Sequence, residues 1–231
     1  MDTNIKKELL RFISEDIQSG DITSVLLPKK KIKAKIISRE DGVLAGIKFA
    51  REIFRLKGCN VRIMKKDGAR LKPSQVVLEV SGSARTVLSC ERTVLNLLSR
   101  MSGIATHTSF LVSKIKKTNK KTSLYSTRKT APGLRYFDKE AVKIGGGYRH
   151  RMALDDMVMI KDNHLLVCDS IEDIIRSARK RHKRVEVEVE NQKDAILAAN
   201  CGATIVMLDN FSPAQIKKTI AALKRRNYVI K

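Results

Sequence analysis

Residues 185–225, VEVEVENQKDAILAANCGATIVMLDNFSPAQIKKTIAALKR, decide the fold class of this chain. The stretch predicts short strands at 185–189 and 204–208, followed by helices at 192–199 and 213–225 respectively. Strands that alternate with helices in this way form right-handed parallel βα units. We therefore expect an α/β fold here, either an open sheet or a barrel, with functional residues at the carboxyl ends of the strands.

The remaining chain divides into two parts that differ in the predicted order of helices and strands. Its first hundred residues predict a compact α+β unit, with helices at 3–14, 47–56 and 84–100 and strands at 31–38, 61–64 and 76–80. From residue 122 onward, further short strands are predicted at 123–126, 157–160 and 228–230.

The composition is that of a globular protein. The 231 residues are 42% hydrophobic, enough to fill a core. No apolar run approaches the roughly 18 residues of a membrane span, and the N-terminus lacks the apolar region of a signal peptide, so we expect a cytoplasmic protein. The four cysteines are scattered without a CxxC pair, which predicts reduced, mostly buried thiols and no zinc site.

The formal net charge of +23 indicates attraction to polyanions, including nucleic acid and phosphorylated metabolites. Lysine and arginine gather at 29–35, 114–121 and 176–184, and such runs are also explained as solvated faces of a lysine-rich protein. Only 4% of residues are aromatic and there is no Trp, so the stacking platforms of single-strand binders are poorly supplied. Nucleic acid is therefore not the partner we expect.

Three polar clusters lie between Thr127 and His164. They are Thr127-Arg128-Lys129-Thr130 with Pro132-Gly133, Gly145-Gly146-Gly147 with His150-Arg151, and Lys161-Asp162-Asn163-His164. The cations predict a pocket for a small molecule with more than one negative charge, and the triple glycine would let the backbone approach that ligand. His150 could instead be a surface residue, and Asn163 or His164 could cap a loop or orient Lys161.

Two carboxylates are candidates for the acidic half of the same site. Glu188 is the middle glutamate of 185–190, where valines occupy one face of the predicted strand and glutamates the other. Asp209 ends the next predicted strand. A solvated edge strand would explain the first pattern, and a turn residue the second. As a pair on adjacent strands, they suit a hard cation such as Mg²⁺ bound together with substrate phosphates.

Eight motifs in order resemble the quinolinate phosphoribosyltransferases, also called carboxylating nicotinate-nucleotide pyrophosphorylases. They are Glu15-Asp16 with Gly20-Asp21-Ile22-Thr23, Glu91-Arg92-Thr93 with Leu95-Asn96, Ser102-Gly103-Ile104-Ala105-Thr106, TRKTAPGLR at 127–135, GGG with HR at 145–151, IKDNH at 160–164, VEVE at 185–188 and LDN at 208–210. Each motif alone is weak, but together they run through nearly the whole chain.

The resemblance implies an N-terminal α/β sandwich domain, expected at 1–105, and an incomplete α/β barrel, expected at 106–231. It also implies a homodimer or homohexamer whose active sites are shared, with Arg92 reaching into a neighbouring subunit's site.

The implied reaction transfers phosphoribose from phosphoribosyl pyrophosphate to quinolinate, with Mg²⁺ and no organic cofactor, and releases pyrophosphate and carbon dioxide to give nicotinate mononucleotide for NAD biosynthesis. By the same resemblance, quinolinate's two carboxylates would be held by Arg128, Lys129, His150, Arg151 and Lys161. Glu188 and Asp209 would meet the ribose hydroxyls and the metal-bound pyrophosphate, and both join Lys129 as expected catalytic residues. Positioning and electrostatics would carry the reaction, with no covalent nucleophile.

Two departures from the family pattern bear on these expectations. Tyr148-Arg149 precedes His150 where many relatives carry Asn, so the pocket rim is expected to differ. The family continues past residue 231 through a Ser-Gly-Gly segment that helps bind the 5-phosphate, so we expect a C-terminally short barrel and impaired activity. A truncated family member, a molybdenum-operon paralogue and a basic nucleic-acid-binding protein stay open as alternatives; Asn163-His164 favours the quinolinate branch.

Overall fold

The protein has a mixed α/β fold, and its computed structural model describes residues 1–168, 170–226 and 228. The chain forms two compact units, a first unit of Met1–His150 and a second unit of Arg151–Lys231. The domain boundary expected after residue 105 lies inside the long helix α3 (Ala84–Thr118). That boundary stays a prediction.

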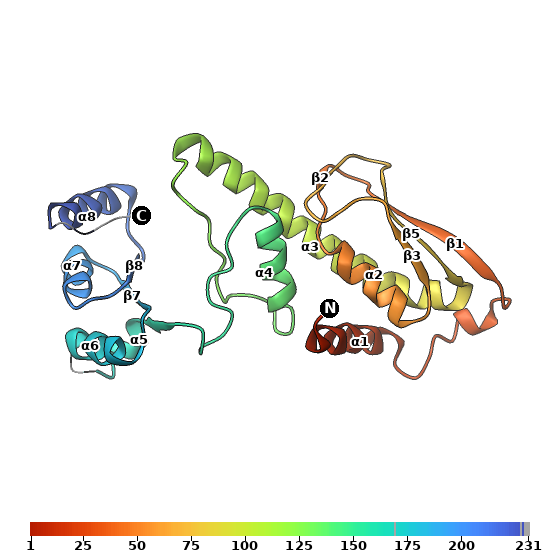
Figure 1. The fold of residues 1–231 in the computed structure, drawn as a ribbon, viewed down its shortest axis with the longest axis horizontal. Helices are drawn as coiled ribbons and strands as arrows, with labels where there is room; N and C mark the ends of the chain where they lie inside the picture. The colour runs from red at the N-terminus through yellow and green to blue at the C-terminus, as the bar shows by residue number, and fades with distance from the viewer. Residues whose placement is uncertain (169, 227, 229–231) are drawn as a thin grey trace. The chain divides into compact units, whose positions relative to one another are not determined.

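The first unit is built on an antiparallel three-stranded sheet. Its strand order is β1 (Lys31–Ile37), β5 (Val76–Ser83) and β3 (Asn60–Ile63). Exposure alternates along β1, since its lysines point to solvent and Ile32, Ala34 and Ile36 pack on the core. Helix α2 (Ile47–Leu56) and helix α3 lie against that apolar face (Figure 1).

Smaller elements complete the first unit. These are α1 (Thr3–Ile17), the 3₁₀ turn η1 (Ser24–Leu26), α4 (Arg135–Ile144) and the strand pair β2 (Gly42–Val43) and β4 (Arg70–Leu71). Helix α4 packs on α3, and its Phe137 meets Phe49 of α2 edge-to-face with ring centroids 5.0 Å apart. The core of this unit therefore extends from the sheet to α4.

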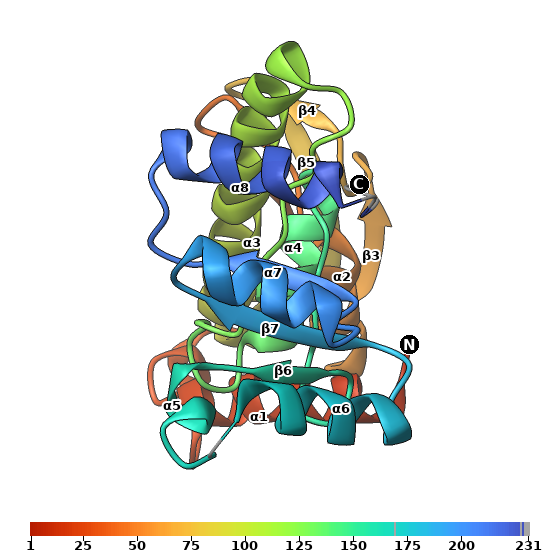
Figure 2. The same ribbon diagram turned by 90° about the vertical axis from the view of Figure 1, so that its left-hand side faces the viewer.

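The second unit contains the expected parallel βα repetition. Its sheet has the order β6 (Val158–Ile160), β7 (Val185–Val189) and β8 (Ile205–Leu208), and helices α6 (Ile171–Arg181), α7 (Gln192–Asn200) and α8 (Pro213–Arg225) lie on one side of it (Figure 2). The short helix α5 (Asp162–Leu165) follows β6. The β7 valines are almost fully buried against Ile175 of α6 and two alanines of α7. Side-chain caps from Ser170, Asn191 and Ser212 begin these three helices.

Several sequence predictions are confirmed to the residue, namely the helices at 47–56 and 213–225 and the strand at 185–189. The helix predicted to end at residue 100 instead continues to Thr118, because Met101, Ala105 and Thr108 extend its buried face. The segment 123–126 forms one isolated bridge and no strand. Of the strand expected at 228–230, residues 229 and 230 lie outside the described residues.

Helices α4 and α6 were not predicted. Helix α4 buries three consecutive charged residues, Asp138, Lys139 and Glu140, which conceal its apolar face in the sequence. Helix α6 has few apolar positions among many charges, and only its Ile175 is buried.

Candidate active site

Two of the predicted polar segments lie side by side within the first unit. Tyr125 and Tyr148 form a parallel bridge, and the Ser126 backbone N–H donates to the Tyr148 carbonyl at 2.8 Å. The Ser126 hydroxyl donates to the Arg149 carbonyl at 2.7 Å. Because the two segments run parallel, the chain leaves the bridge at the same end toward Arg128 and toward His150.

The two cations of the first segment make no ion pair among the described residues. Arg128 is half-buried, and its Nε atom is buried without a hydrogen-bond partner there. Lys129 is exposed. A buried guanidinium nitrogen without a partner costs free energy, and an anionic ligand would supply the missing acceptor.

His150 is half-buried in a strained backbone conformation. Its φ of 50° lies in the left-handed region, which non-glycine residues rarely adopt. The imidazole lies perpendicular to the Tyr125 ring, with centroids 6.4 Å apart. Such conformations gather at functional sites when the surrounding structure holds them.

The triple glycine meets protein atoms. A Cβ added to Gly145 would lie 2.5 Å from the Ala105 carbonyl oxygen of α3, and one added to Gly147 would lie 2.8 Å from Val142. Gly146 has a φ of 93°. The glycines therefore let the turn after α4 pack against α3, and the expectation that they face a ligand is not supported at Gly145 and Gly147.

The carboxyl edge of the second unit's sheet brings two expected site residues into contact. Lys161 directly follows β6, and its ammonium forms an ion pair with Glu188 on the neighbouring strand β7. The Glu188 side chain is 11% exposed and the Lys161 side chain 35%. Since β7 is the central strand of this sheet, the solvated-edge interpretation of its glutamates is wrong.

Asp209 continues the same edge on the next strand. Its backbone N–H donates to the Val189 carbonyl at 2.9 Å, so it stands beside the end of β7. The Asn210 amide donates to Glu190 at 3.1 Å and to Asp209 at 3.2 Å. A ligand at this edge would therefore meet one cation and several oxygen acceptors.

Two further predicted residues have structural contacts. The Nδ1 atom of His164 accepts a hydrogen bond from the Lys161 backbone N–H at 2.9 Å, so His164 caps α5 and fixes the chain at Lys161. Arg151 is only 9% exposed and donates to the Met157 carbonyl at 3.3 Å. The structure thus places Arg128, Lys129 and His150 in the first unit, and Arg151, Lys161, Glu188 and Asp209 in the second.

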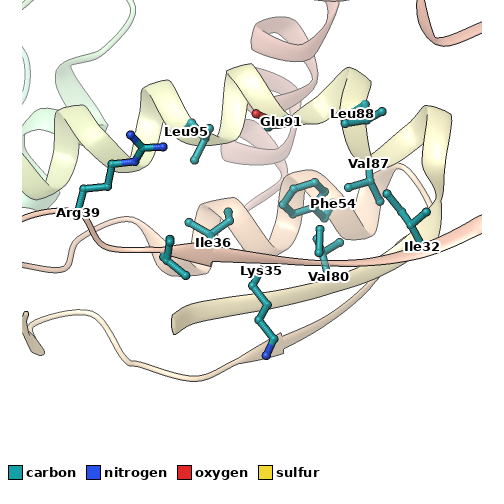
Figure 3. Close-up of a pocket in the computed structure, with 12 residues that line it drawn as sticks. Ile32, Lys35, Ile36, Arg39, Phe54, Val80, Val87, Leu88, Glu91 and Leu95 are labelled. Atoms are coloured by element: carbon teal, nitrogen blue, oxygen red, sulfur yellow. The ribbon is translucent and has the colours of Figure 1, made fainter. Parts of the chain in front are cut away.

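Arg92 lies apart from the other cations of the first unit. It is exposed on α3 and lines a hollow of about 1010 Å³. A smaller hollow of about 300 Å³ lies between β1 and α3, where Ile36, Val80 and Leu95 form an apolar lining (Figure 3). Neither hollow is lined by Arg128, Lys129 or His150.

Two family models match almost the whole chain. The model described as quinolinate phosphoribosyl transferase, N-terminal domain, matches residues 21–102, and the C-terminal domain model matches residues 104–231. The chain belongs to the quinolinate phosphoribosyl transferase family.

Individual members of the quinolinate phosphoribosyl transferase family agree with this assignment. A probable carboxylating nicotinate-nucleotide pyrophosphorylase of Archaeoglobus fulgidus is 44% identical over 207 residues, which are 90% of this chain and 80% of the relative. A second probable carboxylating nicotinate-nucleotide pyrophosphorylase, from Methanothermobacter thermautotrophicus, is 43% identical over 228 residues, which are 96% of this chain and 81% of the relative. The crystal structure of NadC from Streptococcus pyogenes superposes with a TM-score of 0.89 at 38% identity, covering 96% and 81%. This coverage gives no support to the expectation of impaired activity.

Some residues that shape the candidate site were missed in the sequence. Ser126, Lys139 and Glu140 contact Arg149, the residue before His150. The run Asp138-Lys139-Glu140 was a usable signal. If the helix that carries it is buried, these three charges need partners. Their contacts with Arg149 join positions 9 to 23 residues apart, which no local pattern reveals.

Proposed function

We propose that this chain transfers phosphoribose from phosphoribosyl pyrophosphate to quinolinate with loss of carbon dioxide and pyrophosphate, giving nicotinate mononucleotide. Membership of a family whose similar members are named carboxylating nicotinate-nucleotide pyrophosphorylases carries this proposal. Those names also favour the quinolinate branch over a molybdenum-operon paralogue.

The proposed substrate contacts follow from the charges of the site. Arg128, Lys129, His150, Arg151 and Lys161 would hold the two carboxylates of quinolinate. The partnerless Nε of Arg128 supports this role, since planar guanidinium groups bind carboxylates through paired hydrogen bonds. Arg92 would serve a neighbouring subunit of a homodimer or homohexamer.

The proposed chemistry depends on positioning and electrostatics. As pyrophosphate leaves, the ribose carbon develops positive charge, which the Glu188 and Asp209 carboxylates would stabilise while they bind the ribose hydroxyls. Lys129, the third proposed catalytic residue, would hold the attacking quinolinate at the distance of reaction. Quaternisation of the ring nitrogen then allows the adjacent carboxylate to leave as carbon dioxide, and the electron pair left on that ring carbon takes up a proton from solvent.

Mg²⁺ would neutralise charge on the pyrophosphate. The described residues contain no group of three or more His, Cys, Asp and Glu side chains that could hold a metal ion. Glu188 and Asp209 supply two carboxylates at one sheet edge, and one or two carboxylates completed by substrate phosphates is the usual Mg²⁺ arrangement. The residues therefore fit a metal that arrives with phosphoribosyl pyrophosphate.

The finer architectural expectations belong to this proposal. We infer an N-terminal α/β sandwich and an α/β barrel, from the antiparallel sheet of the first unit and the parallel sheet of the second. No helix in the described part of the chain is long and apolar enough to cross a membrane. A cytoplasmic location remains a prediction.

The test is whether the chain forms nicotinate mononucleotide from quinolinate and phosphoribosyl pyrophosphate. Product is measured by chromatography and by the release of labelled carbon dioxide. Arg128→Ala should lower kcat/KM by about 100-fold or more, by analogy with loss of a single charge-stabilising donor. Arg62→Ala removes an exposed arginine on β3 and is the matched control. A folded wild-type chain without product at any Mg²⁺ concentration would overturn the proposal.

A further inference from the structure

Helix α4 carries a buried cluster of charges in the first unit. Asp138, Lys139 and Glu140 are 6%, 0% and 7% exposed. Their helix neighbours Phe137 and Ala141 belong to the hydrophobic core. Ionised groups at such burial are tolerated only when they are paired and hydrogen-bonded, so the partners of this cluster decide what it does.

The partners of Asp138 differ from those of the next two residues. The Arg100 guanidinium of α3 donates to both oxygens of Asp138, at 2.7 and 2.9 Å. Lys139 donates to the backbone carbonyl of Arg149, and Glu140 forms an ion pair with the Arg149 guanidinium. Asp138 therefore joins α4 to α3. Lys139 and Glu140 instead hold Arg149 of the following loop, one at its backbone carbonyl and the other at its guanidinium.

Arg149 is held at further points. Its carbonyl also accepts the Ser126 hydroxyl at 2.7 Å, and its carboxylate partner Glu140 binds Lys48 of α2 at 2.7 Å. The next residue is His150, whose φ of 50° persists only if surrounding contacts over-determine the backbone. The contacts to Arg149 supply that constraint directly before the strained residue.

We propose that Lys139 and Glu140 are positioning residues that fix the His150 imidazole through Arg149. This inference rests on the proposed function, in which His150 meets a quinolinate carboxylate. The Arg149 guanidinium pairs with Glu140 of α4 and anchors the loop there, while its Nε atom is buried without a hydrogen-bond partner among the described residues.

Asp138 offers a matched control for this proposal. Its side chain is 9% exposed and that of Glu140 is 8%; both are carboxylates of α4 paired with arginine. Of these two carboxylates, only Glu140 has a described contact with Arg149, the residue before His150. A purely structural role of the cluster would make Asp138→Asn and Glu140→Gln equivalent.

The experiment compares Glu140→Gln, Lys139→Met and Asp138→Asn by steady-state kinetics with each substrate varied. Glu140→Gln and Lys139→Met should raise the KM for quinolinate by about tenfold, because a small misplacement of a binding group is costly, and leave the KM for phosphoribosyl pyrophosphate unchanged. Asp138→Asn should lower the melting temperature without raising the KM for quinolinate relative to that for phosphoribosyl pyrophosphate. Equal effects of Glu140→Gln and Asp138→Asn on both KM values would overturn the proposal. Should Lys139→Met not fold, Glu140→Gln decides alone.

A second readout separates this inference from the proposed function. The chain has four histidines, so the His150 imidazole resonances can be assigned by comparison with His150→Gln. Glu140→Gln should shift these resonances, and Asp138→Asn should not. Inactivity of the wild-type chain would refute the proposed function and leave this comparison intact. Unmoved His150 resonances in Glu140→Gln would refute the positioning role.

Discussion

Lys161 and Glu188 form an ion pair with each other. An ammonium carries three donors and a carboxylate about four acceptor positions, so this pair leaves capacity on both groups. Lys161 can keep Glu188 and still donate to a quinolinate carboxylate, while Glu188 can accept from a ribose hydroxyl. At the scale of the residue, the pair thus pre-orients two groups that the proposed reaction uses together.

Thiol reactivity is predicted to divide the four cysteines. Burial raises the pKa of Cys59, and burial together with nearby Cys59 raises that of Cys90 to about 11. Both thiols are buried, whereas Cys168 and Cys201 are partly exposed. At pH 8 a disulfide reagent should label Cys168 and Cys201 in the native chain, and the other two only after unfolding. Equal labelling rates for all four would contradict this prediction.

Asp21 is predicted to make stability depend on pH. Hydrogen bonds from Ser24 and from the Ser89 hydroxyl lower its pKa from 3.8 to about 2. A carboxyl with a lowered pKa in the folded state contributes stability above pH 3.8 and loses it as pH falls toward 2. Asp21→Asn should therefore melt below the wild type at pH 7, and the gap should narrow between pH 4 and 2. A constant gap would refute the assignment.

Helix α3 shows at the scale of the element how one helix serves two purposes. Its first half covers the antiparallel sheet, and its second half supports the glycine turn after α4. Gly145 of that turn and Gly103 of α3 have opposite surroundings. Gly145 packs against the α3 backbone, whereas Gly103 is an exposed residue within α3 with no atom inside 4 Å of an added Cβ.

Alanine substitutions at these two glycines should have opposite effects on stability. Gly145→Ala should destabilise by about 1–3 kcal/mol, since its methyl group would overlap the Ala105 carbonyl. Gly103→Ala should stabilise by about 0.5–1 kcal/mol, because alanine loses less backbone entropy in a helix. Urea unfolding of both variants measures the two values. Destabilisation by Gly103→Ala would show that the space beside Gly103 is not open in the folded chain.

The excess charge is unequally divided at the scale of the whole molecule. Residues 1–150 carry 32 Lys and Arg against 13 Asp and Glu, a net +19, while residues 151–231 carry 15 against 11, a net +4. The acidic residues of the proposed catalytic edge belong to the less basic part. The positive field of the first unit would attract the polyanionic substrates.

The proposed sharing of active sites between subunits predicts complementation between inactive variants. Arg92→Ala and Glu188→Gln should each be inactive, because each removes one contribution to every site. Unfolded together and refolded as a mixture, they should recover about a quarter of wild-type activity in a dimer, since half the dimers are hybrids with one intact site of two. Each variant refolded alone is the control. A mixture no more active than its components would argue against donation of Arg92 between subunits.

The parallel βα repetition of the second unit was predictable from sequence, because strand and helix periods alternate locally and the turn residues mark their ends. The pairing of Lys161 with Glu188 was foreseeable in part, since Lys161 follows one predicted strand, Glu188 lies near the carboxyl end of another, and parallel strands share one carboxyl edge. Helix α4 was not predictable, because its buried charges conceal the apolar face that normally reveals a helix.

The sequence by itself determined the family, the strand-helix order of residues 185–225 and the residue types of the candidate site. These depend on local periodicity and on short motifs of neighbouring residues, which can be recognised without the fold. Only the tertiary structure decided that the glycine turn packs on α3 and that Arg149 is anchored to Glu140. Each of these contacts joins residues that are distant along the chain or hidden within a charged run. Burial of charge requires a partner, but only the folded chain determines which residue supplies it.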